Sequence, residues 1–410
     1  MNLIHRTSYW AYISVASFYM SHLKGVVIAS YSRTPIGSFL GSLSNLSATD
    51  LGGHAIKSAI SGARLEPSEI QQGVLGQVLS AGCGQAPARQ AMLGAGVPVS
   101  TDVFLVNKVC SSGMKAISLA SQSIMLGHVD TAVAAGMESM SSVPHALRKA
   151  RQGGYKLGQI AMDDLVITDG LWDVYNNIHM GSCAEKTSKD FSISRRDQDE
   201  YAIESYKRAQ EAWSSGRIID EVVPISNGKQ AIEKDEEVDR LRIDKMASLK
   251  SAFQTNGTIT AANASKLNDG AAAMVLTSDD FARSNGLRPL ARIVASADFA
   301  TNPIDFSIAP KGAIDMALKR ANLNVRDIDY WEINEAFSAV PLVNARQLNL
   351  DLSRVNVDGG AVAMGHPIGM SGTRIVGTLS RILRQRDGRF GCAAICNGGG
   401  GASAIIIGRL

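Results

Sequence analysis

The sequence predicts an α/β protein in which one βα pattern occurs twice. Two observations carry this prediction: short apolar runs alternate with amphipathic segments from residue 25 onwards, and the same order returns after residue 289. Continuous apolar strands between helices are typical of a mostly parallel sheet buried on both faces. The composition agrees, because 45% of the 410 residues are hydrophobic and many of the 39 glycines lie beside apolar runs, as in an enzyme with tight turns.

The two copies are read directly from the chain. In the first copy the expected strands are 24–35, 73–79, 102–106, 130–136 and 270–278, and the expected helices are 48–60, 88–93 and 111–126. In the second copy the expected strands are 290–300, 328–333, 354–357, 391–396 and 402–408, and the expected helices are 311–321, 335–348 and 371–383. Thr49 or Asp50 is the expected cap of the first helix.

A long segment interrupts the first copy. In the second copy the last two strands are separated by one glycine-rich turn, whereas residues 140–268 separate their counterparts. We therefore predict an inserted lobe over one end of the sheet, where it shapes a binding site. The halves are then 25–139 plus 269–288, and 289–410.

The first 24 residues differ from the rest. They contain Arg6, Lys24 and several hydroxyl groups, and the first acidic residue of the chain is Asp50. Such a start predicts a mitochondrial transit peptide, with a disordered extension of a cytoplasmic protein as the alternative. Its apolar part is too short and too polar to span a bilayer, so no membrane span is expected.

Net charge and cysteine usage argue against a nucleic-acid-binding protein, a disulfide-rich protein and a zinc protein. The net charge of +3 gives no reason to expect a nucleic-acid partner. The five cysteines are odd in number and widely spaced, which argues against a disulfide framework. A zinc site is not expected either, because Cys392 and Cys396 have no matching pair near them.

Four chemically useful side chains follow predicted strands: Cys110, Asn334, His366 and Cys396. Ligands of open α/β sheets bind at the carboxyl ends of the strands, so we expect these groups to converge on one cleft. Each has a structural alternative. Asn334 would cap the next helix, His366 would bond a local carbonyl in a turn, and the cysteines would be core or hairpin residues.

The surroundings favour chemistry. Cys110 precedes a helix, whose first N–H groups are expected to stabilise its thiolate and lower its pKa. His366 lies in "GGAVAMGHPIGMSG", where glycines and Pro367 specify the loop, as for a general base or a group that polarises a carbonyl. Cys396 opens "CNGGGGA", whose backbone can aim N–H groups at an oxyanion.

Six blocks together carry a family resemblance. "NKVCSSGMKA", "NEAF", "GGAVAMGHPIGMSG" and "CNGGGGA" resemble the catalytic blocks of the thiolase family, and "HMGSCAE" and "ITAANASKLNDGAAA" resemble two further motifs. The chain is most similar to short-chain acetyl-CoA acetyltransferases of the mitochondrial type. The resemblance implies a five-layer αβαβα core, an inserted loop domain that holds coenzyme A, no redox cofactor, and a homotetramer built from dimers.

The resemblance also assigns roles. It implies that Cys110 is the nucleophile, that His366 activates it, and that Cys396 is the general acid and base. Asn334 would hold a water that forms one oxyanion hole with His366. Backbone N–H groups of Cys110 and Gly398 would form the second. The implied reaction is the reversible thiolysis of acetoacetyl-CoA through an acetyl-cysteine, and a thiol pKa tuned towards neutrality would suit Cys396.

Further positions carry over from the family. The implied coenzyme A contacts are Leu171, His179, Tyr206, Arg240, Lys245 and Ser265. A subtype that uses a potassium ion and accepts 2-methyl-branched substrates implies the ion's ligands as Tyr206, Ala261, Ala262, Ala264 and Val362, with Phe306 beside the acyl pocket. Two alternatives remain open: a condensing enzyme of the ketoacyl-synthase kind, which uses a second histidine in place of Cys396, and an inactive binder of coenzyme A or lipid.

Overall fold

The computed structural model describes residues 23–410, so the predicted transit peptide lies outside the described residues except for its last two positions. The main sheet is built from β1 (Val26–Arg33), β2 (Gly37–Ser38), β3 (Gln72–Gly76), β4 (Asp102–Val106), β5 (Thr131–Ser139), β12 (Asn268–Ser278), β13 (Ala291–Ala300), β14 (Tyr330–Ile333), β15 (Phe390–Asn397) and β16 (Gly401–Gly408). Its strand order is β14-β15-β16-β13-β1-β12-β5-β3-β4, and β2 pairs with β12.

The helices lie on both faces of this sheet and beyond its end. They are α2 (Ala48–Ala63), α3 (Pro87–Gly94), α4 (Ser112–Met125), α5 (Met180–Asp190), α6 (Arg195–Ser214), α7 (Ile243–Met246), α8 (Asp279–Ser284), α9 (Ala309–Ala321), α10 (Ala339–Leu348), α11 (Ala361–Met364) and α12 (Ser371–Gln385). Three small hairpins join β6 (His145–Ala146) to β7 (Asp163–Asp164), β8 (Trp172–Asp173) to β9 (Ile178–His179), and β10 (Ile225–Ser226) to β11 (Ala231–Ile232). No helix in residues 23–410 has the length and apolar character needed to cross a membrane.

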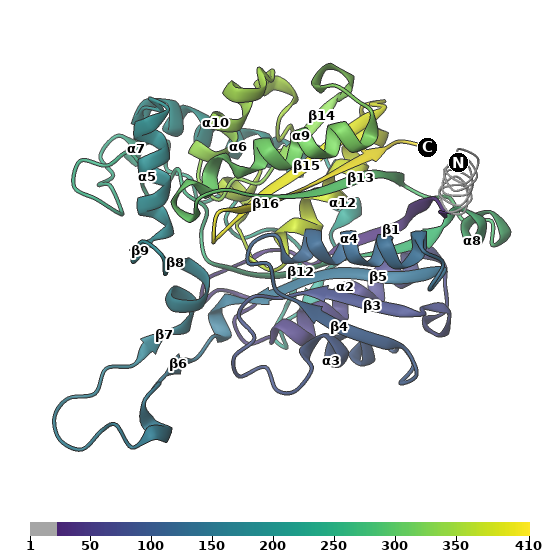
Figure 1. Cartoon of the computed structure of the whole chain (residues 1–410), viewed down its shortest axis with the longest axis horizontal. Coiled ribbons are helices and arrows are strands. Elements are labelled where there is room, and N and C mark those ends of the chain that lie inside the picture. The colour runs from purple at the N-terminus through teal and green to yellow at the C-terminus, as the bar shows by residue number, and fades with distance from the viewer. Residues whose placement is uncertain (1–22) are drawn as a thin grey trace, which may run out of the picture.

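The main sheet has two halves, and with the helices between and outside them it forms five layers. The antiparallel pairing of β1 with β13 joins the two halves. Helices α4 and α12 pack against each other between them, in a core that includes Met114, Ile117, Ile375 and Leu379. Helices α2 and α3 cover the outer face of the first half, and α9 and α10 lie over the outer face of the second. This is the predicted αβαβα arrangement, with the second half above the first in Figure 1.

The prediction of a mostly parallel sheet was wrong, because the sheet is mixed. Strand β3 is parallel to β4 and β5, and β14 is parallel to β15, but β12 and β16 run antiparallel to their neighbours. Strand β16 follows β15 after a tight turn in which Gly399 and Gly400 have φ of 82° and 81°. Such a turn reverses the chain direction, and the apolar strand pattern does not record direction.

Some predicted elements also differ. Residues 354–357 form no strand: Val355 makes one bridge to Trp331, and then Asn356 turns the chain at φ 48°. Helix α10 begins at Ala339 instead of residue 335, which places Pro341 in its first turn, where no N–H is needed. The cap of α2 is Ser47, whose side chain accepts from the N–H of Asp50.

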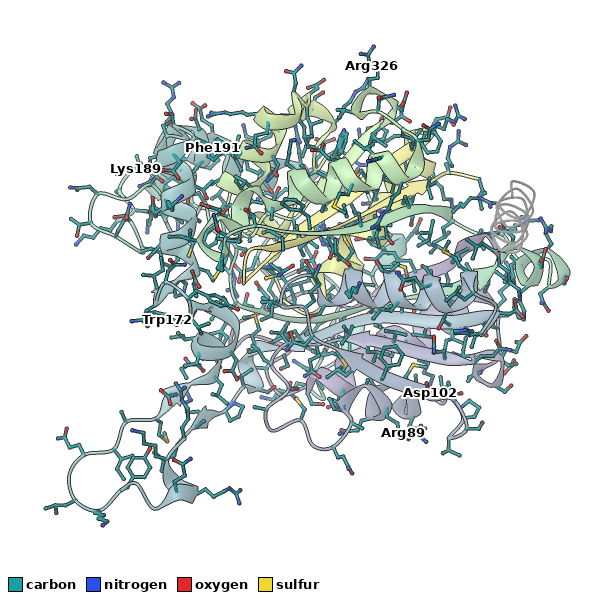
Figure 2. All side chains as sticks on the ribbon, viewed as in Figure 1. Arg89, Asp102, Trp172, Lys189, Phe191 and Arg326 are labelled. Atoms are coloured by element: carbon teal, nitrogen blue, oxygen red, sulfur yellow. The ribbon has the colours of Figure 1, made fainter. Side chains whose placement is uncertain are left out.

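The segment between β5 and β12 lies outside the main sheet and contains α5, α6 and α7. Its first part is an arm, residues 143–164, that carries β6 and β7 and projects from the body (Figure 1). The side chains of the arm point into open space, and Trp172 lies near its base (Figure 2). Leu157 is fully exposed at the tip. The division into an inserted domain of residues 140–268 and two halves stays a prediction.

Candidate active site

A strained turn places Cys110 between β4 and α4. Val109 has φ 48°, a left-handed conformation that a β-branched residue rarely adopts. The hydroxyl of Ser112 holds the turn, since it donates to the carbonyl of Val109 at 2.6 Å and accepts from the N–H of Lys108 at 2.8 Å. A Cβ on Gly76 would lie 2.4 Å from the carbonyl carbon of Ser112, so the start of α4 packs directly on β3. The half-buried Cys110 faces a cavity.

The thiol of Cys110 is protonated at rest. Burial raises its pKa to about 12, although the N–H groups of Gly398 and of Cys110 itself donate to the sulfur and oppose the rise. The expectation that the helix start lowers this pKa was therefore wrong. The free-energy cost of desolvating a thiolate here exceeds the stabilisation that the two backbone N–H donors give it. Cys110 needs a base before it can attack.

His366, the base that the sequence predicts, lines the same cavity as Cys110. It is buried in the loop between α11 and α12, which begins at Gly365 with φ 112°. The hydroxyl of Ser371 donates to the carbonyl of Pro367 at 3.0 Å, so it accepts from Nδ1–H of His366 at 2.6 Å. This leaves the lone pair on Nε2. Burial, with a smaller effect of Arg374, lowers the pKa of His366 to about 3, so the imidazole is neutral near pH 7.

Asn334 lies beside His366, and Cys396 near Cys110, but neither of them lines the cavity. The side-chain amide of Asn334 is 3.4 Å from Nε2 of His366, and its Oδ1 has no partner among residues 23–410. Asn334 does not cap α10, which begins at Ala339. Cys396 is buried in β15, where burial first and the nearby Cys110 second raise its pKa well above the usual value. The expectation of a thiol tuned towards neutrality was wrong for this state.

The sequence reasoning missed Glu138, a buried carboxyl at the end of β5. It accepts from the N–H groups of Val78, Leu79 and Gly369, between 2.9 and 3.1 Å. Gly369 belongs to the loop of His366, so Glu138 ties that loop to the first half. Burial raises the pKa of Glu138 to about 7. Its only signal in the sequence is an acid in an otherwise apolar strand.

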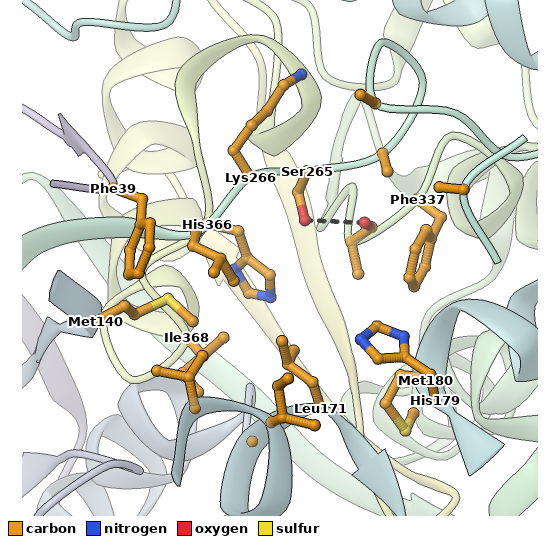
Figure 3. A pocket seen from close by; sticks show the side chains of 18 of the residues that line it. Phe39, Met140, Leu171, His179, Met180, Ser265, Lys266, Phe337, His366 and Ile368 are labelled. Atoms are coloured by element: carbon orange, nitrogen blue, oxygen red, sulfur yellow. Dashed lines mark hydrogen bonds between the residues drawn. The ribbon is translucent and has the colours of Figure 1, made fainter. Parts of the chain in front are cut away.

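One cavity of about 590 Å³ collects most predicted residues. Its lining includes Cys110, Leu171, His179, Arg240, Ala261, Ala264, Ser265, Phe306, His366 and Gly398. Two predicted coenzyme A contacts, Tyr206 and Lys245, do not line it, and neither do Ala262 and Val362 of the predicted potassium set. Figure 3 shows the rings of His366 and His179 facing the space from opposite sides.

The wall of the cavity is largely aromatic and apolar, which sequence reasoning did not foresee. His179 stacks on Phe253 with ring centroids 4.8 Å apart, and Phe337 lies edge-on to both Phe253 and Phe306. Burial lowers the pKa of His179. The hydroxyl of Ser265 donates to the carbonyl of Ala336 at 2.9 Å. Such a lining, with a few polar groups among aromatic side chains, suits a small-molecule ligand.

Two of the five predicted potassium ligands, Tyr206 and Val362, are already engaged by a side chain. Lys266 Nζ donates to the hydroxyl of Tyr206 at 2.8 Å and to the carbonyl of Val362 at 2.9 Å. It also lies 5.1 Å from the centroid of the Tyr206 ring. Burial lowers the pKa of Lys266 to about 8, against the raising effect of Glu237 and Glu335. A potassium ion on these ligands would meet the ammonium, so the residues present do not fit it.

Comparisons with known proteins agree with this geometry. Residues 26–280 match the thiolase N-terminal domain and residues 287–409 the thiolase C-terminal domain. The chain is 54% identical over 394 residues to mitochondrial acetyl-CoA acetyltransferase of Homo sapiens, covering 95% of this chain and 91% of the relative. It is 52% identical over 394 residues to mitochondrial acetyl-CoA acetyltransferase A of Xenopus laevis, covering 95% and 93%. The crystal structure of the Acat5 thiolase from Ascaris suum in complex with coenzyme A superposes with a TM-score of 0.91 at 46% identity, covering 94% of this chain and 100% of that one.

Proposed function

The chain belongs to the thiolase family, and from this premise we propose that it is an acetyl-CoA C-acetyltransferase. The proposed reaction is the reversible thiolysis of acetoacetyl-CoA with coenzyme A to two acetyl-CoA. One observation carries the assignment of the site: the Cys110 thiol, bonded by the N–H of Gly398, and His366, whose lone pair lies on Nε2, line one apolar cavity.

The first half-reaction transfers an acetyl group to the enzyme. His366 Nε2 takes the proton of Cys110 as the sulfur attacks the ketone carbon of acetoacetyl-CoA, so that no free thiolate–imidazolium pair has to form in the buried site. Donors around the cleft stabilise the oxyanion, with His366 and an Asn334-bound water proposed as one hole. The carbon–carbon bond then breaks, which leaves an acetyl-cysteine and the enolate of acetyl-CoA. Cys396 protonates that enolate, a role that suits a thiol with a raised pKa because it holds its proton until a carbanion forms.

The second half-reaction returns the enzyme to its starting state. Cys396, now a thiolate, takes the proton of the coenzyme A thiol, and the resulting sulfur attacks the acetyl group on Cys110. The N–H groups of Cys110 and Gly398 are the proposed donors to this second oxyanion, and their existing bonds to the sulfur support the assignment. The tetrahedral intermediate expels the Cys110 sulfur as acetyl-CoA leaves, and His366 returns its proton to that sulfur. Two half-reactions at one site imply ping-pong kinetics.

Coenzyme A is proposed to enter along the aromatic wall. Leu171, His179 and Ser265 line the cavity and are the proposed pantetheine contacts. Arg240 lines it as well and is the proposed phosphate contact, together with Lys245 of the exposed α7. The coenzyme A complex of the Ascaris suum thiolase supports coenzyme A as the substrate class.

The decisive experiment is thiolysis of acetoacetyl-CoA, monitored as the loss of the absorbance of its enolate. The wild-type chain should consume acetoacetyl-CoA and release acetyl-CoA, and Cys110→Ala should not. Brief exposure to acetyl-CoA should add one acetyl group, located on Cys110 by mass spectrometry. A wild-type chain without turnover or adduct would favour an inactive binder. Turnover that requires malonyl-CoA would favour a decarboxylating condensing enzyme.

We propose in addition that 2-methylacetoacetyl-CoA is a substrate. Phe306 lines the same cavity as Cys110 and lies 6.3 Å from Phe337, centroid to centroid, so the acyl end is bounded by two flat apolar rings. A methyl branch gains contact there. Thiolysis of the methylated substrate tests this, and turnover of acetoacetyl-CoA alone would contradict it.

Location and assembly complete the proposal. The relatives are mitochondrial enzymes by name, which supports a mitochondrial location; a cytoplasmic one is the alternative. Imaging of residues 1–24 fused to a fluorescent protein decides between them. A homotetramer is proposed, because the projecting arm exposes the apolar residues Leu157, Ile160 and Met162.

A further inference from the structure

Lys266 makes a set of contacts that resembles the coordination of a metal ion. Its ammonium has two oxygen partners, the phenol of Tyr206 and the carbonyl of Val362, and one aromatic face. Both oxygens accept from it, and neither comes from a carboxylate. In Figure 3 its side chain points away from His366 and out of the space between the two histidines. Lys266 therefore acts on the wall of the cavity and not on the reacting atoms.

The contacts join three separate parts of the chain. Lys266 follows Ser265 in the segment that lines the cavity, Tyr206 lies in α6 of the inserted segment, and Val362 lies in α11, shortly before His366. A second connection runs beside it. The N–H of Val362 donates to Glu335 at 2.9 Å, and Glu335 accepts the hydroxyl of Ser205 of α6 at 2.8 Å. The ammonium of Lys266 thus connects three segments: the one that lines the cavity at Ser265, helix α6, and helix α11, which precedes the loop of His366.

We propose that the ammonium of Lys266 stands in for a bound potassium ion, so that this chain needs no monovalent cation for activity. The inference departs from the potassium site that the family resemblance implies, and its activity readout rests on the proposed function. An ammonium and a potassium ion are both monovalent cations. Carbonyl and phenol oxygens accept hydrogen bonds from the first and coordinate the second, but two such charges at one place repel each other. The ammonium is covalently part of the chain, so placing it costs none of the translational entropy that binding a free ion costs.

Two variants separate the charge from the space that it fills. Lys266→Ala removes the ammonium and opens room beside Tyr206 and Val362. Lys266→Met removes the ammonium but keeps an apolar stem in that room. Initial rates of thiolysis and melting temperatures are measured for the wild type and both variants in equal concentrations of KCl and NaCl.

The wild type should have the same rate and the same melting temperature in both salts. In NaCl both variants should lose roughly tenfold in kcat/KM, the order expected for losing hydrogen bonds from a charged group. KCl should restore part of this loss, and raise the melting temperature, for Lys266→Ala but not for Lys266→Met. A crystal of Lys266→Ala grown with rubidium should show the ion between Tyr206 and Val362.

Other results would overturn the inference. Activation or stabilisation of the wild type by KCl would show that the ion binds despite Lys266. Variants with wild-type rate and melting temperature in both salts would show that the charge has no role. If the wild type has no thiolysis activity, the proposed function fails, but the melting temperatures and the rubidium crystal still decide the cation inference.

Discussion

At the scale of single residues, the site pairs two neutral groups. Burial keeps Cys110 as a thiol and His366 as a neutral imidazole. In the proposed mechanism, charge appears only as the proton moves from sulfur to Nε2 during the attack on substrate. This arrangement limits reaction of the resting enzyme with stray electrophiles, because the thiolate is the nucleophile.

We therefore predict how alkylation of Cys110 depends on pH. The thiolate fraction grows about tenfold per pH unit as long as pH is below the thiol pKa. Since burial raises the pKa of Cys110 to about 12, inactivation by iodoacetamide should become faster with every unit from pH 6 to 9, without a plateau. The measurement uses a Cys83→Ala background, because Cys83 is also partly accessible. A plateau near pH 7 would indicate a preformed thiolate–imidazolium pair.

Ser371 is a positioning residue by the same reasoning. It accepts Nδ1–H of His366 and so keeps the lone pair on Nε2. Ser371→Ala should lower kcat roughly tenfold, because part of the imidazole adopts the wrong tautomer, and should leave KM nearly unchanged. Ser371→Thr keeps the hydroxyl and should recover much of the rate. A rise in KM with constant kcat would instead indicate a packing role.

At the scale of elements, glycines set the distance between α4 and α12. A Cβ on Gly372 would lie 2.4 Å from the backbone nitrogen of Met114, and one on Gly113 would lie 2.8 Å from the carbonyl oxygen of Gly369. The start of α4, which follows Cys110, and the start of α12, which follows the loop of His366, are thus in backbone contact. The proposed nucleophile Cys110 and the proposed base His366 come from the first and second halves of the chain, and this contact holds the segments that carry them together.

Gly372→Ala should therefore destabilise the protein by about 1–3 kcal/mol, as for other insertions into a packed core, and lower kcat as well. Gly94→Ala is the matched control, because Gly94 ends α3 on the surface and nothing lies within 4 Å of its added Cβ. Chemical unfolding and thiolysis rates measure both effects. Equal stability of the two variants would argue against a tight contact between α4 and α12.

The same elements show what the sequence can predict and where it stops. Helical periodicity is enough to predict α4, α9 and α12, although α9 buries one face in the core and α12 is buried on all sides from Ser371 to Leu383. The direction of β12 and the loss of a strand at 354–357 depend on pairing between distant segments. Glu138 and Lys266 were missed for a related reason. The partner Gly369 lies 231 positions from Glu138, and Tyr206 lies 60 positions from Lys266, so no local pattern marks either residue.

At the scale of the whole molecule, the arm and the sheet edge are the surfaces that we propose as contacts between copies of the chain. Strand β4 is an edge of the main sheet and exposes Phe104, and the arm exposes Leu157, Ile160 and Met162. Replacement of residues 147–161 by a short Gly-Ser linker should reduce a tetramer to dimers, because it removes the apolar arm and leaves the β4 edge intact. Light scattering after gel filtration measures this. An unchanged mass would assign assembly to other surfaces.

The placement of β12 has a consequence for synthesis. This strand lies between β1 and β5 and pairs with both, with Ser278 opposite Val26 and Gly136 opposite Ala272. A ribosome that has finished β5 has still to make the whole inserted segment before it supplies the strand between them. During that interval β1 and β5 expose unpaired apolar edges, which is the condition under which nascent chains aggregate or recruit chaperones. A chain that terminates inside the inserted segment therefore lacks the strand that joins β1 to β5 in the first half.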